Sequence, residues 1–190
     1  MRITKDIPYG SNGMQLDLYA PDQDGFDTLI WFHGGGFETG SRRDAEPLAE
    51  SVTALGLGFA SVEYRMFPSA RFPDFLLDAA WSVAFLQKHG QDCGCGGRFV
   101  ISGQSAGAYI TMMLALNGAL LHNAGVDETS ILAYLSESSQ QTTHYNMLRQ
   151  RGIDSRAERI DEEAPLYYVG QRPLTKPLLL IYNAEDIPCR

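Results

Sequence analysis

Apolar and polar positions alternate along this chain of 190 residues in short blocks, which predict strands and helices in turn. Residues 14–19 alternate apolar and polar side chains, as expected for an early edge strand of a sheet. Short apolar runs further on predict buried strands, and longer runs between them predict helices. The expected later strands are 28–32, 58–64, 98–102, 131–136 and 177–182. The expected helices are 45–55, 73–89, 105–116 and 143–151.

This alternation of strands with helices favours an α/β fold. Successive strands that are joined by helical crossovers run parallel, and such crossovers are right-handed. We therefore expect a doubly wound, mostly parallel sheet with helices on both faces. The chain contains no internal repeat or interdomain linker, and its 44% hydrophobic content suits one core. Residues 1–190 are expected to form a single domain, with the charged stretch 149–163 on its surface.

Two glycine-rich clusters follow apolar runs. The later one, Gly103-Gln104-Ser105-Ala106-Gly107, fits the G-x-S-x-G pattern of a sharp strand-to-helix turn that exposes a nucleophilic serine. Gly103 and Gly107 let the strand and the helix approach closely, because a Cβ at either position would clash. Ser105 would then lie at the N-terminus of a helix, where partial positive charge favours developing negative charge. The alternative is a serine that merely caps a core helix.

The earlier cluster, His33-Gly34-Gly35-Gly36, fits the HGGG loop that supplies backbone N–H donors to an oxyanion. Three consecutive glycines cost conformational entropy, so they indicate a constraint on the backbone, which we interpret as close approach to a ligand oxygen. The tetrahedral intermediate of acyl transfer carries such an oxyanion. The expected donors are the N–H groups of Gly35, Gly36 and Ala106. His33 is expected to orient the loop rather than to act as a general base.

With both clusters in this order, the chain resembles α/β-hydrolases of the esterase/lipase group, which includes the hormone-sensitive-lipase-like carboxylesterases and the bacterial acetyl esterases. The resemblance implies the α/β-hydrolase fold and a serine carboxylic-ester hydrolase that works through an acyl-enzyme, without a cofactor or metal. It also implies Ser105 as nucleophile and Asp186 as the acid that orients a histidine base, a role for which the adjacent Glu185 competes. The matching segments are 31–37, 62–65, 73–86, 103–107 and 176–186.

The histidines depart from the pattern of this group, in which the triad runs serine, acid and then histidine. None of the four histidines, His33, His89, His122 and His144, follows Asp186. We therefore expect a C-terminally truncated hydrolase that lacks the last helix–strand–helix portion of the fold and has little or no activity. His144 is the candidate for a substitute base, and the competing interpretation is a polar residue at a helix start. We expect no catalytic role for His89 or His122.

Two other functions stay open from the sequence. An amidase, such as a formamidase, would use the same serine and oxyanion loop, and a catalytically inactive hydrolase-like binding protein would account for the absent histidine. For an enzyme, the short segment before the glycine loop shows no helical lid, so an open site is expected. Such a site suits short acyl groups on a larger alcohol, for example an acylated sugar. A homodimer would cover a sheet edge that truncation leaves exposed.

Composition narrows the partners and the location. A net charge of −8 and a pI near 4.9 argue against nucleic acid and anionic membrane surfaces as partners. No apolar run has the length of a transmembrane helix and the N-terminus shows no signal-peptide pattern, so a cytoplasmic location is expected. Cys93 and Cys95 resemble half a metal site, but no second pair is near, which favours a loop of reduced thiols. Asp78, a carboxylate on an apolar helix, is expected to accept hydrogen bonds from backbone near the Ser105 turn.

Overall fold

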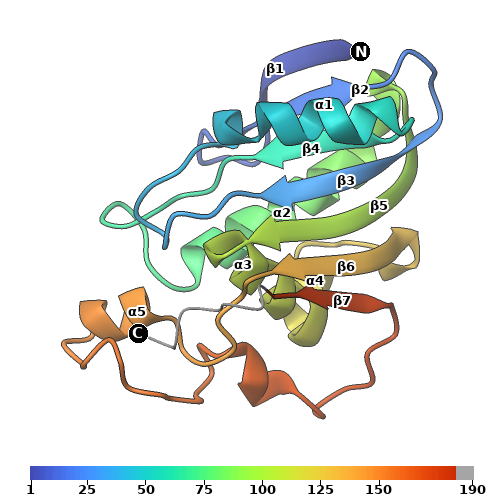
Figure 1. Ribbon diagram of the computed structural model, residues 1–190. Coiled ribbons are helices and arrows are strands. Elements are labelled where there is room, and N and C mark those ends of the chain that lie inside the picture. Colours follow the sequence, from blue (N-terminus) through green and yellow to red (C-terminus); the bar gives the residue numbers. More distant parts are fainter. Residues whose placement is uncertain (183–190) are drawn as a thin grey trace.

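The computed structural model describes residues 1–182, which form a seven-stranded sheet with helices packed on both faces (Figure 1). The strand order is β1-β2-β4-β3-β5-β6-β7. The pairs β1–β2 and β2–β4 are antiparallel, and all other neighbours are parallel. The strands are β1 (Arg2–Pro8), β2 (Gln15–Ala20), β3 (Phe26–Phe32), β4 (Gly58–Val62), β5 (Cys95–Gln104), β6 (Ile131–Glu137) and β7 (Leu178–Ile181). The expected doubly wound, mostly parallel sheet is confirmed.

The amino-terminal edge of the sheet differs from the prediction. Strand β2, which the sequence placed at the edge, lies between β1 and β4. The outer strand β1 was missed because almost all of its side chains are exposed and several are charged. An edge strand of this kind carries little of the alternation that identifies a half-buried strand, while its charges discourage pairing with other chains.

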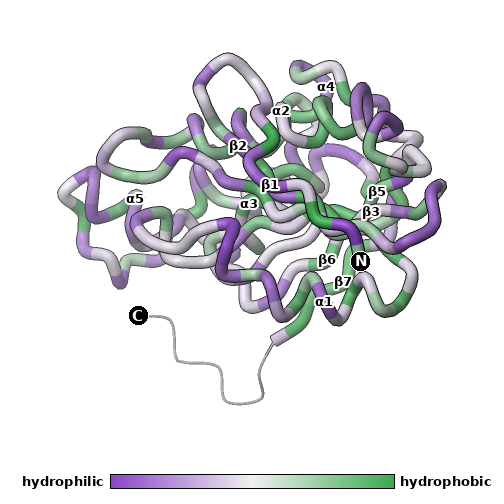
Figure 2. Tube along the Cα trace, turned by 90° about the horizontal axis from the view of Figure 1, so that it is seen from above, coloured by the Kyte–Doolittle hydropathy of each residue, from purple (hydrophilic) through white to green (hydrophobic). Residues whose placement is uncertain are grey.

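The helices divide between the two faces of the sheet. Helix α1 covers one face, and α2, α3 and α4 cover the other (Figure 1). Helix α5 lies beyond the carboxyl ends of the parallel strands, where the chain is mainly hydrophilic (Figure 2). The helices are α1 (Glu46–Ala54), α2 (Asp74–His89), α3 (Ala106–Leu116), α4 (Gly118–Asn123) and α5 (Tyr145–Gln150). Short 3-10 helices are η1 (Arg42–Ala45), η2 (Gly90–Cys93), η3 (Glu128–Ser130) and η4 (Pro165–Tyr168).

The hydrophobic core has one large part and one small part. The large part lies between the sheet and helices α2 and α3, and the small part lies under α1 around Trp31 and Phe59. Helix α3 is buried on nearly all sides, from Ala106 to Ala115. A helix that is apolar all round packs inside a protein rather than on its surface. The central strands and α3 therefore form the most enclosed part of the molecule.

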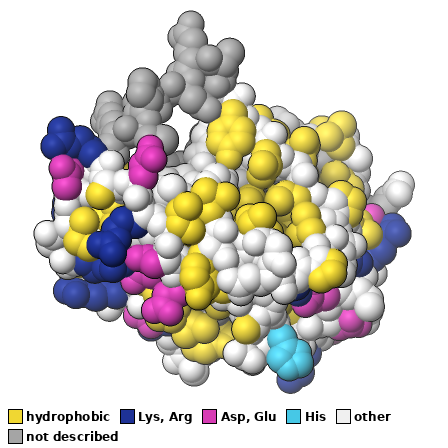
Figure 3. All heavy atoms as spheres, turned by 90° about the horizontal axis from the view of Figure 1, so that it is seen from below, with side chains coloured by type: hydrophobic (Ala, Val, Ile, Leu, Met, Phe, Trp, Pro, Cys, Tyr) yellow, Lys and Arg dark blue, Asp and Glu magenta, His cyan; other side chains and the backbone are white. Residues whose placement is uncertain are grey.

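The opposite edge of the sheet is apolar and exposed. Among the described residues, β7 pairs with β6 and has no strand on its other side. Leu179 is 53% exposed, and Leu180, Ile181 and Tyr182 are exposed to a similar degree. Figure 3 shows hydrophobic side chains gathered on the face at this end of the sheet. An edge of this kind leaves backbone groups and apolar side chains in water.

Asp78 on α2 is fully buried, as a structural carboxylate would be, but its main partner differs from the prediction. The guanidinium of Arg65 binds it with Nε and Nη2, each 2.8 Å from a carboxylate oxygen, and the Arg65 backbone N–H donates at 2.9 Å. The expected partner, backbone near the Ser105 turn, was wrong because α2 packs behind the segment that follows β4. A buried carboxylate needs a compensating charge of this kind.

The cysteines of the described region are free thiols, with Cys95 buried and Cys93 half-buried. Within residues 1–182, no three His, Cys, Asp or Glu side chains are arranged to hold a metal ion. No helix in this part of the chain has both the length and the apolar character needed to cross a membrane.

Candidate active site

Ser105 occupies a sharp turn between the end of β5 and the start of α3. Its backbone has φ 53° and ψ −112°, a conformation that residues with a side chain rarely adopt. The side chain is exposed, whereas Ala106 and the following turn of helix are buried. The Ser105 N–H donates to Glu137 O at 2.8 Å, which ties the turn to the neighbouring strand β6. A strained and exposed serine persists only where the surrounding structure fixes it, and this pattern is typical of functional sites.

The two glycines of the turn have steric reasons for being glycine. A Cβ at Gly103 would overlap the backbone of Gly107, and a Cβ at Gly107 would overlap the carbonyl of Phe32 at the end of β3. The strand-to-helix turn is therefore pressed against the centre of the sheet. This close approach is the one that the G-x-S-x-G spacing predicted.

The glycine loop lies directly beside the serine. A Cβ at Gly34 would stand 3.2 Å from Gln104 O and 3.4 Å from the Cβ of Ser105. Gly35 and Gly36 have φ of 110° and 64°, which favour glycine. Gly35 O accepts hydrogen bonds from the N–H groups of Glu38 and Thr39, both at 3.1 Å. Because the peptide is trans, the N–H of Gly36 points away from that carbonyl and its partners.

His33 holds the base of this loop and is almost fully buried. Its Nδ1 lies 2.7 Å from Gly34 O, and its Nε2 lies 3.2 Å from Glu63 Oε1. The ring stacks on Tyr64 with 4.3 Å between centroids, and the Tyr64 hydroxyl donates to His33 O at 2.7 Å. These contacts use both ring nitrogens to orient the loop, which is the role expected for His33 from the sequence.

Helix α5 also contacts the glycine loop, at Gly36, and the sequence did not predict this contact. The amide of Asn146 donates to Gly36 O, and the Tyr145 hydroxyl lies so close to Gly36 that a Cβ there would overlap it. The His144 ring packs edge-on against Phe37, with 4.7 Å between centroids. Asn146 is fully buried. No local pattern signals contacts between residues more than a hundred positions apart.

His144 is not placed to serve as a base. It is the N-cap of α5, and its Nδ1 accepts from the Asn146 N–H at 3.3 Å. Burial lowers the pKa of His144 to about 3. A histidine whose lone pair is engaged and whose affinity for protons is this low is a poor general base near neutral pH. The interpretation of His144 as a polar residue at a helix start is the correct one.

The two remaining histidines lie far from the serine in the topology. His89 is the last residue of α2, and this helix ends near the start of β5. Ser105 follows the other end of β5. His122 lies in the last turn of α4, which follows α3. The acid candidates Asp186 and Glu185 lie outside the described residues. Of the predicted site, the structure thus brings together Ser105 with its neighbour Ala106 and the glycine loop.

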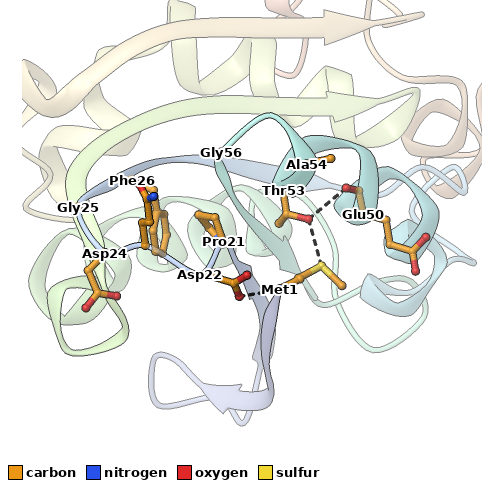
Figure 4. A pocket seen from close by; sticks show the side chains of 11 residues that line it. Met1, Pro21, Asp22, Asp24, Gly25, Phe26, Glu50, Thr53, Ala54 and Gly56 are labelled. Carbon is orange, nitrogen blue, oxygen red and sulfur yellow. Dashed lines mark hydrogen bonds and ion pairs between the residues drawn. The ribbon is translucent and has the colours of Figure 1, made fainter.

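Two hollows differ in their relation to the serine. A cavity of about 440 Å³ adjoins the glycine loop and is lined by residues that include Gly34, Gly35, Gln104 and Glu137. A larger one of about 760 Å³ lies at the amino ends of the parallel strands (Figure 4). There the amino group of Met1 pairs with Asp22 at 2.9 Å. The larger hollow therefore lies at the amino ends of the parallel strands, whereas Ser105 lies at their carboxyl ends.

The fold and the serine turn define an α/β-hydrolase of the esterase/lipase group. The sequence matches the BD-FAE family over residues 16–150, which is most of the chain, and the chain belongs to this family. The structure is similar to that of a putative thioesterase from Silicibacter sp. tm1040, with a TM-score of 0.77 and 18% identity over 99% of this chain and 69% of that one. It is also similar to a bacterial heroin esterase, with a TM-score of 0.68 and 22% identity over 94% of this chain and 64% of that one.

Relatives by sequence are ester hydrolases. The probable carboxylic ester hydrolase LipM of Mycobacterium tuberculosis is 33% identical over 119 residues, which cover 58% of this chain and 28% of LipM. Human hormone-sensitive lipase is 33% identical over 115 residues, which cover 57% of this chain and 11% of the lipase. The isoprenylcysteine alpha-carbonyl methylesterase ICME of Arabidopsis thaliana is 29% identical, covering 99% of this chain and 50% of ICME. The chain spans half or less of the length of each of these three relatives.

Proposed function

We propose that this chain carries the nucleophile and the oxyanion hole of a serine carboxylic-ester hydrolase. The observation that carries the proposal is the exposed Ser105 in a strained turn, with the HGGG loop against its Cβ. The ester hydrolases among its relatives support the reaction class. A non-catalytic binding protein would have no need to keep a strained serine and three glycines at one point.

The proposed chemistry is acyl transfer through an acyl-enzyme. Ser105 Oγ attacks the ester carbonyl, and the resulting oxyanion accepts hydrogen bonds from the N–H groups of Gly35, Gly36 and Ala106. The alcohol leaves, and water then hydrolyses the acyl-enzyme. In this scheme a histidine takes the proton of Ser105, and Asp186 orients that histidine. We do not assign that base to any of the four histidines, because His33 and His144 are engaged in other hydrogen bonds and His89 and His122 lie at the ends of α2 and α4.

The first test is covalent labelling of Ser105 by a fluorophosphonate, located by peptide mass spectrometry. We expect slow labelling by residues 1–190, because a serine without a histidine base beside it loses on the order of 10⁶ in turnover and keeps roughly 10³–10⁴ over water from the oxyanion donors. Ser105→Ala should abolish the labelling. Ser51→Ala, a change at an exposed helical serine, is the matched control and should leave it intact. Labelling that persists in Ser105→Ala would refute the proposal.

The second part of the proposal is a short acyl group on a larger alcohol. The natural comparison is hydrolysis of acetate, butyrate and palmitate esters of one chromogenic alcohol by the whole protein. The rate should fall with chain length. A preference for palmitate would contradict an open site for small acyl groups, and hydrolysis of formamides but not esters would reassign the reaction to an amidase.

A further inference from the structure

Both ring nitrogens of His33 face oxygen atoms, whereas a neutral imidazole has only one N–H to donate. Nδ1 lies 2.7 Å from the carbonyl of Gly34, which can only accept, so Nδ1 carries a proton. Nε2 lies 3.2 Å from a carboxylate oxygen of Glu63. A neutral ring has one N–H, and that proton is already used toward Gly34. Either Glu63 is protonated or His33 carries a proton on both nitrogens.

The surroundings of Glu63 favour its ionised form. Its second oxygen, Oε2, accepts from the Arg42 backbone N–H at 3.3 Å and from Ser41 Oγ at 3.4 Å, and the Arg42 guanidinium lies 3.5 Å away. Burial opposes ionisation of this carboxyl, but the bond from His33 and the contacts from Arg42 outweigh it, so the pKa of Glu63 is held below its usual range. Arg42 is itself balanced by Asp17 at 3.0 Å. A carboxylate that accepts from three groups is expected to be charged.

The remaining contacts of His33 also suit a cation. The ring is stacked on Tyr64 at an interplanar angle of 15°, and the face of an aromatic ring attracts a positive charge. Burial raises the pKa of Tyr64 well above its usual range, so its hydroxyl stays protonated and donates to His33 O. Glu63 is thus the one negative charge in contact with the ring in the described structure, and Arg42 lies beyond it as a positive one.

We propose that His33 is an imidazolium held by Glu63 behind the glycine loop, and that Glu63 is a positioning residue of the oxyanion hole. The charged ring donates to Gly34 O and fixes the Gly34–Gly35 peptide, so the N–H of Gly35 points the opposite way. A positive charge behind this peptide polarises it and strengthens the N–H as a donor. The catalytic part of this inference rests on the proposed function, whereas the charge state of His33 does not.

Nuclear magnetic resonance of the 190-residue chain with ¹⁵N-labelled histidine tests the charge state directly. At neutral pH His33, assigned with a His33→Gln variant, should show protons on both ring nitrogens. Glu63→Gln keeps the shape of the side chain but offers an N–H to Nε2, so His33 should become neutral with one N–H. Ser41→Ala removes only the 3.4 Å hydrogen bond to Glu63 Oε2 and keeps both contacts from Arg42, so Glu63 should stay charged and both protons should stay in place.

Several results would overturn the charge assignment. A single N–H signal from the His33 ring in the unaltered chain would overturn it, whether or not the Glu63→Gln variant folds. Two N–H groups in a folded Glu63→Gln variant would show that Glu63 does not hold the charge, and loss of a proton in Ser41→Ala would show that the contacts from Arg42 do not keep Glu63 charged.

Labelling of Ser105 by the fluorophosphonate tests the positioning role. Glu63→Gln should slow it on the order of tenfold relative to Ser41→Ala, since the charge behind the donor is lost while the packing is kept. Equal rates in the two variants would overturn the positioning role and leave the proposed function standing. No labelling of Ser105 in the unaltered chain would refute the proposed function, and the charge state of His33 would still be decided by its N–H signals.

Discussion

The centre of the sheet and its β7 edge are built in opposite ways. At the centre, β3 lies between β4 and β5 and its side chains are largely buried, and the serine turn packs against its carboxyl end. At the edge, β7 is four residues long, has one neighbouring strand in the described structure and exposes three of its four side chains. The candidate site lies at the central strands, beside a helix whose residues are almost all buried.

This difference has a physical reason. A non-glycine residue in a strained conformation such as that of Ser105 costs on the order of 1–3 kcal/mol, and it persists only where the surroundings leave no alternative. Around Ser105 these constraints are Gly103, Gly107 and the hydrogen bond to Glu137 O. The β7 edge, with few neighbours, could not hold a backbone in such a state. A reactive residue such as Ser105 is therefore expected at the centre of the sheet. The exposed β7 edge is expected to take part in association between molecules instead.

The largest effect is expected where a methyl group is added at the centre of the sheet. Gly107→Ala should destabilise the protein by more than about 4 kcal/mol or prevent folding, because the new Cβ overlaps the Phe32 carbonyl and neither backbone can move away. The matched control is Gly170→Ala, at an exposed position with φ 82° and open space around it. There the cost should be about 1–2 kcal/mol, from the backbone conformation alone.

Urea denaturation followed by circular dichroism measures both variants. A Gly107→Ala protein as stable as Gly170→Ala would mean that the turn can relax and that the centre of the sheet is not rigid.

The sequence revealed most of the strands and helices, and it missed two elements with little apolar pattern. Strands β2 to β7 and helices α1, α2, α3 and α5 were predicted because their apolar residues form runs or a regular alternation. The edge strand β1 and the short helix α4 were missed because neither has a clear apolar period. Local patterns report burial, and elements that bury little leave little pattern.

The candidate site shows the same limit. The G-x-S-x-G and HGGG spacings predicted the serine turn and the glycine loop because their geometry is set within a few residues. The grip of Asn146 on Gly36 and the pairing of Glu63 with His33 depend on tertiary contacts between distant segments. The partner of Asp78 was wrong for the same reason, because Arg65 comes from another element. Long-range polar partners require the fold to be known first.

A smaller test, by pH, compares a buried histidine with an exposed one. The unfolded chain binds a proton at His144 below about pH 6.5, whereas burial lowers its pKa in the folded protein to about 3. The unfolded state therefore binds more protons across this window, and the free energy of unfolding should fall with falling pH by up to about 1.4 kcal/mol per unit. His144→Gln should reduce that slope, while His122→Gln, at an exposed position, should leave it unchanged.

The quantity to compare is the slope of the free energy of unfolding against pH, measured by urea titration at each pH, rather than its absolute value. Equal slopes for the unaltered chain and His144→Gln would show that His144 is accessible to protons in the folded state. The loop beside Gly36 would then be less enclosed than the centre of the sheet.

The smallest expected change in stability is at the β7 edge, where Leu179 is 53% exposed. Leu179→Lys should change the free energy of unfolding by no more than about 0.5 kcal/mol, because the side chain is already largely in water. Its effect should appear in self-association instead, since a lysine on an edge strand opposes strand-to-strand pairing between molecules. We expect the 190-residue chain to associate with rising concentration in sedimentation velocity, and Leu179→Lys to reduce this.

The control for this change is Leu55→Lys at the end of α1, where the leucine is 78% exposed on a different surface. It adds the same charge away from the edge and should not reduce association, since both variants change the net charge equally, from −8 to −7. If Leu55→Lys reduced association as much as Leu179→Lys, loss of exposed apolar surface in general rather than the open strand would be the cause. A loss of stability in Leu179→Lys as large as that in Gly107→Ala would mean that the edge is as tightly constrained as the centre, and the contrast between the two regions would not hold.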